Sequence, residues 1–254
     1  MKCIMSIAGS DSISGAGIQA DIKTAYSLGF HAVTVITAIT AQNSLEVSDI
    51  FPVPADFIKK QMETLLKDIR PDSVKIGMIF SADAISCIRE EILKHRLSPV
   101  VLDPIIRASV GRMLLEEDAL ERLKKDLFPV VDVITPNIEE AEILCGIKIN
   151  SLEDVEECAR RLKGLGPDVV ITGYYKEGFM IDVAYDGKKM TYIKGKRVKN
   201  ENNHGSGCVF STALSAFLAK GKGFKKAAML AHKITRKAIK RGYQLGKGKG
   251  PVRP

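Results

Sequence analysis

Short apolar segments alternate with amphipathic segments along almost the whole chain, and this alternation constrains the fold more than any other feature of the sequence. Apolar segments short enough for buried strands lie at residues 3–7, 32–36, 73–78, 100–102, 131–134 and 169–171. Helical spacing of apolar residues predicts helices at 16–28, 57–69, 82–93, 117–127, 139–144, 152–162, 208–219 and 224–240. Strands joined through helices form right-handed crossovers, so the sequence predicts an α/β fold with a mostly parallel sheet covered on both faces.

A small hairpin is expected near the end of this pattern. Residues 180–185 and 190–193 flank Asp186-Gly187, a dipeptide that favours tight hairpin turns. No linker, repeat or low-complexity segment divides residues 1–254, so a single domain is expected. Ligands of such sheets bind beyond the carboxyl ends of the strands, and the candidate site is therefore expected there.

The positive charge is concentrated at the C-terminal end. The net charge is +8, yet no Asp or Glu follows Glu201, and twelve Lys or Arg lie from Lys220 to Pro254. Nucleic-acid-binding segments are often basic in this way, but here the only aromatic residues are Phe224 and Tyr243, and no nucleic-acid-binding motif accompanies them. The favoured interpretation is a solvated helix face that helps to attract an anionic substrate, with no nucleic-acid partner.

Targeting features and cysteine usage favour a cytoplasmic protein without a membrane partner. No apolar run reaches the roughly 20 residues of a membrane span. The N-terminal residues MKCIMSIAGSD read as a first strand and not as a cleaved signal peptide. The cysteines are scattered and form no C-x-x-C pair, which argues against a disulfide framework or a zinc site. They are Cys3, Cys87, Cys145, Cys158 and Cys208.

The first candidate group is a glycine-rich turn between a predicted strand and a helix, with the sequence 9-GSDSISGAGIQAD-21. Gly9, Gly15 and Gly17 would let the backbone approach a ligand closely, or would serve only tight packing. The turn lacks the G-K-[ST] ending of a P-loop, and its spacing does not fit G-x-G-x-x-G. The sequence leaves both interpretations open.

The second group is acidic. Asp103 ends the segment VVLD, and Asn137 and Glu140 lie in 135-TPNIEEAE-142, which follows the next predicted strand. Their oxygen atoms at one sheet edge suit a hard cation that carries phosphates. Alternatively, Asp103 caps a turn before Pro104 and the glutamates form a solvated helix face.

The third group opens the helix predicted at 208–219. Gly205, Ser206 and Gly207 precede it, and a helix N-terminus with glycines offers unpaired N–H groups to an anion. The field at a helix N-terminus lowers the pKa of a nearby thiol, so the pKa of Cys208 is expected to be lowered. Cys208 is then either a proton acceptor for a bound hydroxyl or a small packing residue. His204 either donates to a phosphate or orients the turn.

Taken together, these segments are similar to a known family. GSDSISGAGIQAD, TAITAQNS, VKIGM, VLDP, ITPNIEEAE, HGSGC and GKGKGPV follow in this order over almost the whole chain. The chain resembles the hydroxymethylpyrimidine/phosphomethylpyrimidine kinases of thiamine biosynthesis, within the ribokinase-like superfamily. The resemblance implies a three-layer α/β/α sandwich and a homodimer. It also implies an enzyme that uses ATP and Mg²⁺, and it leaves room for a monovalent cation.

The reaction and the site residues follow from the same resemblance. It implies phosphorylation of 4-amino-5-hydroxymethyl-2-methylpyrimidine and then of its monophosphate to the diphosphate. The implied pyrimidine-binding residues are Gln42, Gly9 and Met78, and the implied anion hole is Gly205, Ser206 and Gly207. Cys208 is at the position of the family's proposed base. Asp103, Asn137 and Glu140 correspond to the region that organises metal and phosphates, with Asp103 and Glu140 as metal ligands.

The chain departs from the family pattern at three positions. Ser14 replaces a glycine, and Thr172 and Ser109 occupy the positions of two lysines that face phosphate. Arg107, Arg112 or Lys176 would then compensate for the missing charge. Two other functions stay open at this point: a pyridoxal or pyridoxine kinase, whose substrate is also a hydroxymethyl heteroaromatic, and a catalytically weak ligand-binding homologue.

Overall fold

The computed structural model describes residues 1–107, 111–116 and 118–254, and its strands form one nine-stranded sheet. Ser109 and the first residue of the helix predicted at 117–127 lie outside the described residues. The strand order is β3-β2-β1-β4-β5-β6-β7-β8-β9. The strands are β1 (Cys3–Asp11), β2 (His31–Gln42), β3 (Val47–Pro52), β4 (Ser73–Ile76), β5 (Val100–Leu102), β6 (Val133–Ile134), β7 (Asp168–Lys176), β8 (Phe179–Tyr185) and β9 (Met190–Lys196).

The centre of the sheet is parallel and its two ends are antiparallel. Neighbouring strands from β2 through β1, β4, β5 and β6 to β7 all pair in parallel. The predicted hairpin forms between β8 and β9, and β7 pairs antiparallel with β8. The prediction of a mostly parallel sheet with a hairpin near residues 180–193 is confirmed.

The helices agree with the predicted segments in number and place, with one difference of type. They are α1 (Gly17–Ser27), α2 (Ala55–Leu66), α3 (Ala82–His95), α4 (Ala119–Arg122), α5 (Ile138–Cys145), α6 (Leu152–Lys163), α7 (Ser206–Ala219) and α8 (Phe224–Lys240). The region predicted as one helix at 117–127 changes geometry: α4 continues as a π-helical turn, Leu123–Leu127, and a 3-10 turn, Phe128–Val130. Pro129, which donates no backbone hydrogen bond, lies in that last turn.

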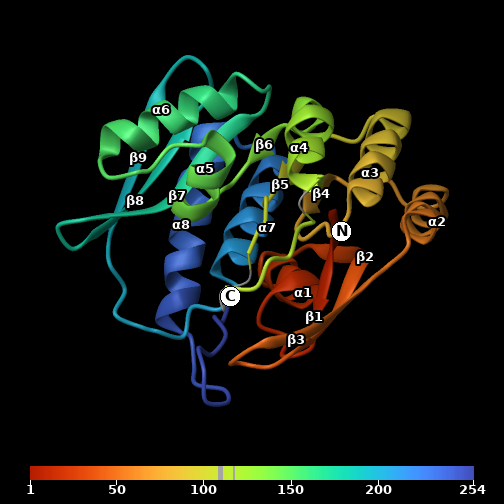
Figure 1. Cartoon of the computed structure of the whole chain (residues 1–254), viewed down its shortest axis with the longest axis horizontal. Helices are drawn as coiled ribbons and strands as arrows, with labels where there is room; N and C mark the ends of the chain where they lie inside the picture. Colours follow the sequence, from red (N-terminus) through yellow and green to blue (C-terminus); the bar gives the residue numbers. More distant parts are fainter. Residues whose placement is uncertain (108–110, 117) are drawn as a thin grey trace.

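Helices cover both faces of the sheet, as expected for a three-layer α/β/α sandwich. Val100 and Leu102 point into the larger core beneath α2 to α6, whereas Val101 points into the core beneath α7 and α8. Figure 1 shows α1, α7 and α8 together on one side of the sheet. Within the described ranges, no helix has the length and apolar character needed to cross a membrane.

The sequence did not predict β3, the edge strand. It pairs antiparallel with β2 from Ala38↔Pro52 to Gln42↔Val47. Only Val47 of β3 is buried, and the strand contains Asp49 and ends at Pro52. A strand of this kind forms because its neighbour offers hydrogen bonds, not because of a local apolar pattern.

Candidate active site

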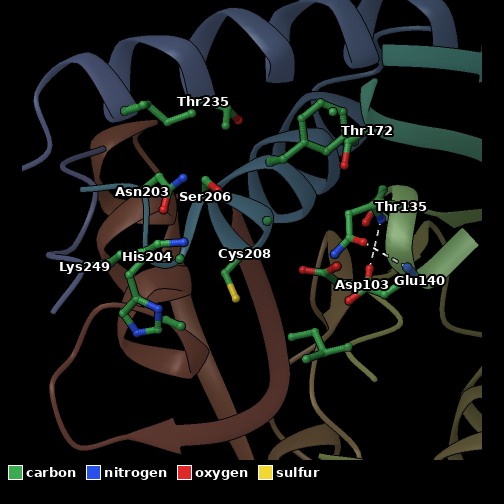
Figure 2. A pocket seen from close by; sticks show the side chains of 18 of the residues that line it. Asp103, Thr135, Glu140, Thr172, Asn203, His204, Ser206, Cys208, Thr235 and Lys249 are labelled. Carbon is green, nitrogen blue, oxygen red and sulfur yellow. Dashed lines mark hydrogen bonds between the residues drawn. The ribbon is translucent and has the colours of Figure 1, made fainter. Parts of the chain in front are cut away.

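A cavity of about 1660 Å³ opens at the carboxyl ends of the parallel strands. Its volume exceeds the roughly 300–1,000 Å³ of a typical small-molecule pocket, so it has room for two substrates. Most of the residues singled out in the sequence line this one cavity, and Figure 2 shows Asp103 and Glu140 together to one side of Cys208. These residues are Gly9, Gln42, Met78, Asp103, Arg107, Asn137, Glu140, Gly205, Ser206, Gly207 and Cys208.

The loop after β1 folds around one carboxylate. Asp11 Oδ2 accepts hydrogen bonds from the N–H groups of Gly15, at 3.0 Å, and Ala16, at 2.8 Å. The same oxygen lies 2.9 Å from His204 Nε2. Burial by itself would raise the pKa of Asp11, but the hydrogen bonds from His204 and from backbone N–H groups hold that pKa below its ordinary 3.8. In its charged carboxylate form, Asp11 therefore connects the first loop to the turn before α7.

That turn, residues 204–208, is called the glycine turn below, and it packs directly on the first loop. A Cβ atom at Gly205 would lie 1.8 Å from the Gly15 carbonyl oxygen, and one at Gly15 would lie 2.2 Å from His204 Cδ2. Gly205 also has φ +83°, in the left-handed region. Of the two interpretations of Gly15, close packing is the one that the contacts support. His204 orients the turn through Asp11.

The glycine turn leads into the N-terminus of α7. Gly205 is the residue before the helix, and Ser206, Gly207 and Cys208 form its first turn. The first N–H groups of a helix have no intrahelical acceptor and carry the positive end of the helix dipole. Ser206, Gly207 and Cys208 line the cavity, so this helix end faces the space where an anion would bind.

Cys208 is a neutral thiol in this environment. Its exposed fraction is 4%. Burial raises the pKa of the thiol to about 12, Asp21 and Asp103 raise it further, and only Lys75 among the nearby charges opposes them. The expectation of a lowered pKa is therefore wrong: loss of hydration at this depth outweighs the field of the helix end.

A buried ion pair lies behind Cys208, and sequence reasoning missed it. Lys75 Nζ on β4 is 2.9 Å from both carboxylate oxygens of Asp21 on α1. Ser6 and Thr212 donate to the same carboxylate at 2.6 and 2.8 Å. The side chains of Lys75 and Asp21 are 0% and 1% exposed. A lysine in the middle of an apolar buried strand was the signal that could have revealed the pair.

The acidic group, Asp103 and Glu140, lies beside the start of α7: a Cβ atom at Gly207 would lie 3.5 Å from Asp103 Oδ2. Burial raises the pKa of Asp103 to about 6, although Lys75 and a hydrogen bond from Ser211 act against this. Burial also raises the pKa of Glu140 to about 8, with the nearby charge of Asp103 as the next cause. Two buried carboxylates that repel each other favour a bound cation.

Helix capping holds the Glu140 side chain in place. Asn137 Oδ1 accepts from the Glu140 N–H at 3.0 Å, and Glu140 Oε2 accepts from the Asn137 N–H at 2.9 Å. Asp103 is held by Ser211 Oγ at 3.1 Å. The pair offers oxygen donors from two residues, and no group of three or more His, Cys, Asp or Glu gathers for a metal within the described ranges. This fits Mg²⁺, which commonly uses one or two carboxylates together with substrate phosphates.

The pyrimidine end expected from the resemblance is built by β1, β2 and the end of β4. Gln42 Oε1 accepts from Thr40 Oγ1 at 3.2 Å, which leaves its amide N–H groups for other partners. A Cβ atom at Gly9 would lie 3.0 Å from Met78 Sδ, so glycine lets Met78 pack over this strand. Gln42, Gly9 and Met78 thus share one end of the cavity.

The cations in the cavity differ from those expected. Arg107 lines it, and its Nε donates to Met113 Sδ at 3.1 Å. Arg112 instead donates to the carbonyl oxygens of Val47 and Ser48. Lys176 is exposed at the end of β7 and is not among the lining residues. Sequence reasoning missed the cations that do line the cavity besides Arg107: Lys196, Arg197, Lys199, Arg236 and Lys249.

Comparison with known proteins identifies one kinase family over almost the whole chain. The family model described as phosphomethylpyrimidine kinase matches residues 11–253. A hydroxymethylpyrimidine/phosphomethylpyrimidine kinase of Aquifex aeolicus is 39% identical over 246 residues, which are 96% of each chain.

Two solved structures show the same ribokinase-like fold. An ADP complex of Bacillus subtilis pyridoxal kinase superimposes with a TM-score of 0.93 at 35% identity, covering 100% of this chain and 97% of that one. A Clostridium difficile phosphomethylpyrimidine kinase gives 0.81 at 37% identity, covering 92% and 98%.

Proposed function

The chain belongs to the phosphomethylpyrimidine kinase family, and from that premise we propose that it transfers the γ-phosphoryl group of ATP to a hydroxymethylpyrimidine in two steps. The first acceptor is the hydroxyl of 4-amino-5-hydroxymethyl-2-methylpyrimidine, and the second is the monophosphate formed from it. The single observation that carries the proposal is the cavity that brings Asp103 and Glu140 together with the glycine turn and Cys208.

The glycine turn and the acidic pair suit the charge of phosphoryl transfer. The new bond forms between the acceptor oxygen and the γ-phosphorus as the bond from that phosphorus to the β–γ bridging oxygen breaks, and ADP leaves. Charge on the transferred group is stabilised by fixed donors, here the N–H groups at the start of α7. Asp103 and Glu140 would hold Mg²⁺, which supplies positive charge to the phosphates when bound. The ATP phosphates would then lie beside Glu140 and the N-terminus of α7.

Cys208 lies where the acceptor hydroxyl would meet the glycine turn. With a pKa of about 12, its thiol carries its proton at neutral pH. It can accept a hydrogen bond from the hydroxyl in that state, and it becomes a proton acceptor only after losing its own proton. Lys75 favours the thiolate. Because the transition state of phosphoryl transfer is loose, the hydroxyl proton is lost late, and proton acceptance is expected to contribute no more than about 10²-fold, the lower end of its usual range.

Pyridoxal phosphorylation is the second candidate, because the Bacillus subtilis enzyme that superimposes so closely is a pyridoxal kinase. Both acceptors carry a hydroxymethyl group on a heteroaromatic ring. Gln42 favours the pyrimidine, because an amide offers donors and an acceptor to a ring nitrogen and an amino group together.

One experiment tests both candidates. The purified protein is incubated with ATP and Mg²⁺ and with either the hydroxymethylpyrimidine or pyridoxal, and the products are read by mass spectrometry. Mono- and diphosphorylated pyrimidine is the expected result. Pyridoxal phosphate alone would replace the proposal with the second candidate, and the absence of product in both tubes despite pyrimidine binding would support a ligand-binding homologue.

A further inference from the structure

The C-terminal residues 243–252, called the C-terminal strap below, lie along the glycine turn. The His204 N–H donates to the Gly250 carbonyl oxygen at 3.2 Å, and the Val252 N–H donates to the His204 carbonyl oxygen at 3.1 Å. Asn202 Oδ1 accepts from the Gly250 N–H at 2.9 Å. These bonds fix the strap against the part of the cavity that faces the N-terminus of α7.

The strap is also attached to the pyrimidine end of the cavity. The Gly248 N–H donates to Ser44 Oγ at 3.0 Å, two residues after Gln42. A Cβ atom at Gly248 would lie 1.8 Å from the Ser44 carbonyl oxygen. The strap therefore spans from the strand that carries Gln42 to the glycine turn, and its glycines are required by this close approach.

Lys249 is the side chain that the strap brings to the cavity. Residues 246–250 read GKGKG, so Lys247 and Lys249 are the only side chains there beyond glycine. Lys249 lines the cavity, whereas Lys247 does not. Figure 2 shows Lys249 beside His204, at the side of the pocket that holds Ser206 and Cys208. Lys249 makes no hydrogen bond or ion pair with any other residue that the structure describes.

The other cations of the cavity come from different elements. Lys196 ends β9, and Arg197 and Lys199 follow it. Arg236 on α8 donates to the Lys196 carbonyl oxygen at 2.7 Å. Among these lining cations, Lys249 directly precedes Gly250, whose carbonyl oxygen accepts from the His204 N–H of the glycine turn.

We propose that Lys249 binds the phosphate of the monophosphorylated acceptor and so specifically supports the second phosphorylation. This inference rests on the proposed function. The first acceptor is a neutral alcohol, whereas the second carries a phosphate with a charge of about −1.5 to −2 at pH 7. This phosphate must meet the γ-phosphoryl group at the N-terminus of α7. The dipole of that helix supplies only about half of a positive elementary charge. A lysine ammonium on the strap supplies a full positive charge at that place.

The test compares the two acceptors in one set of proteins. kcat/KM is measured separately for the hydroxymethylpyrimidine and for its monophosphate, with ATP and Mg²⁺ saturating, in wild type, Lys249→Ala and Lys249→Arg. Lys247→Ala is the matched control, because Lys247 is a lysine of the same strap outside the cavity lining. The affinity for the monophosphate without nucleotide is measured by calorimetry.

Lys249→Ala is expected to lower kcat/KM for the monophosphate by about tenfold or more, as for loss of a charge-assisted hydrogen bond, and to weaken monophosphate binding similarly. For the alcohol, Lys249→Ala is expected to lower kcat/KM by less than about threefold. Lys249→Arg is expected to recover most of the loss with the monophosphate, and Lys247→Ala is expected to behave as wild type with both acceptors.

Equal losses for both acceptors would overturn the inference and assign Lys249 to the nucleotide or to the fold of the strap. Unchanged values for both would equally overturn it. Either result leaves the kinase function standing, whereas a wild-type protein inactive on both acceptors would refute the proposed function and the inference with it.

Discussion

Replacing Glu140 with glutamine should make the ligand-free protein more stable while impairing its activity. The Glu140 carboxylate is buried beside Asp103, and its pKa is raised from the ordinary 4.5 to about 8. Glutamine keeps the shape and can still accept the Asn137 N–H in the capping box. The substitution therefore removes a charge without removing the cap.

The magnitude follows from the difference in pKa between the folded and the unfolded chain. Below pH 4.5 the carboxyl is protonated in both states, so it has no effect on stability. As the pH rises toward 8, the unfolded chain ionises freely and the folded protein does not, so the wild type loses stability over this window. At about 1.4 kcal/mol per pH unit, the full loss is about 5 kcal/mol above pH 8. Asp103 shares the proton equilibrium, and dividing the loss equally between the two carboxylates leaves about 2 kcal/mol for Glu140 alone.

Urea unfolding at pH 5 and pH 9, without Mg²⁺ or nucleotide, measures this difference. Glu140→Gln should gain about 2 kcal/mol over wild type at pH 9 and little at pH 5. Glu139→Gln, an exposed neighbour on the same helix, is the control and should change stability little at either pH. A gain for Glu140→Gln that is equal at both pH values, or no gain at pH 9, would refute the argument.

Three further predictions concern residues around the cavity and behind it. Cys208→Ala should lower turnover at least about tenfold with the alcohol in steady-state assays. The loss should be much smaller with the monophosphate, because that acceptor has no hydroxyl proton to lose. Equal losses with both acceptors would make Cys208 a packing residue. Ser14 has φ +59°, and its backbone makes the bonds that hold the turn, so Ser14→Gly should raise the free energy of unfolding by about 1 kcal/mol, measured in urea. Lys75→Met leaves Asp21 charged and without its ion-pair partner in the core, and should lower the free energy of unfolding by about 3–5 kcal/mol. The double variant Lys75→Met with Asp21→Asn should recover part of this loss. A double variant no more stable than Lys75→Met would contradict the ion-pair explanation.

Most of the fold could be predicted from the sequence because its elements follow local periodicity. The helix at 224–240 was predicted to its ends, and the strand at 100–102 likewise. Helix α6 opens with the capping box Ser151–Asp154, whose residue types and spacing are visible in the sequence. The edge strand β3 was missed because its residues, VSDIFP, carry no alternating apolar pattern and rely on β2 for hydrogen bonds.

The site could be predicted in part. Asp103, Glu140 and the glycine turn follow strand ends or open a helix, and parallel strands bring such positions to one edge. Lys176 was out of place because neighbouring strand residues point to opposite faces: Tyr175 lines the cavity, whereas the side chain of Lys176 is exposed outside it. Lys249 was missed because the segment around it, GKGKG, carries no apolar pattern. Hydrogen bonds from the Gly248 and Gly250 N–H groups to Ser44 and Asn202 hold this segment in place.

The sequence by itself determined which chemical groups are available and in which order the strands and helices follow, because both depend on residue type and local spacing. Only the tertiary structure decided which of these groups are charged and which of them pair with one another. Burial and the charges of Asp21 and Asp103 raise the pKa of the Cys208 thiol, against the opposing charge of Lys75. Asp21 and Lys75, far apart in the chain, form one ion pair. Hydration and Coulomb energies sum over neighbours in space, and no spacing along the chain encodes that sum.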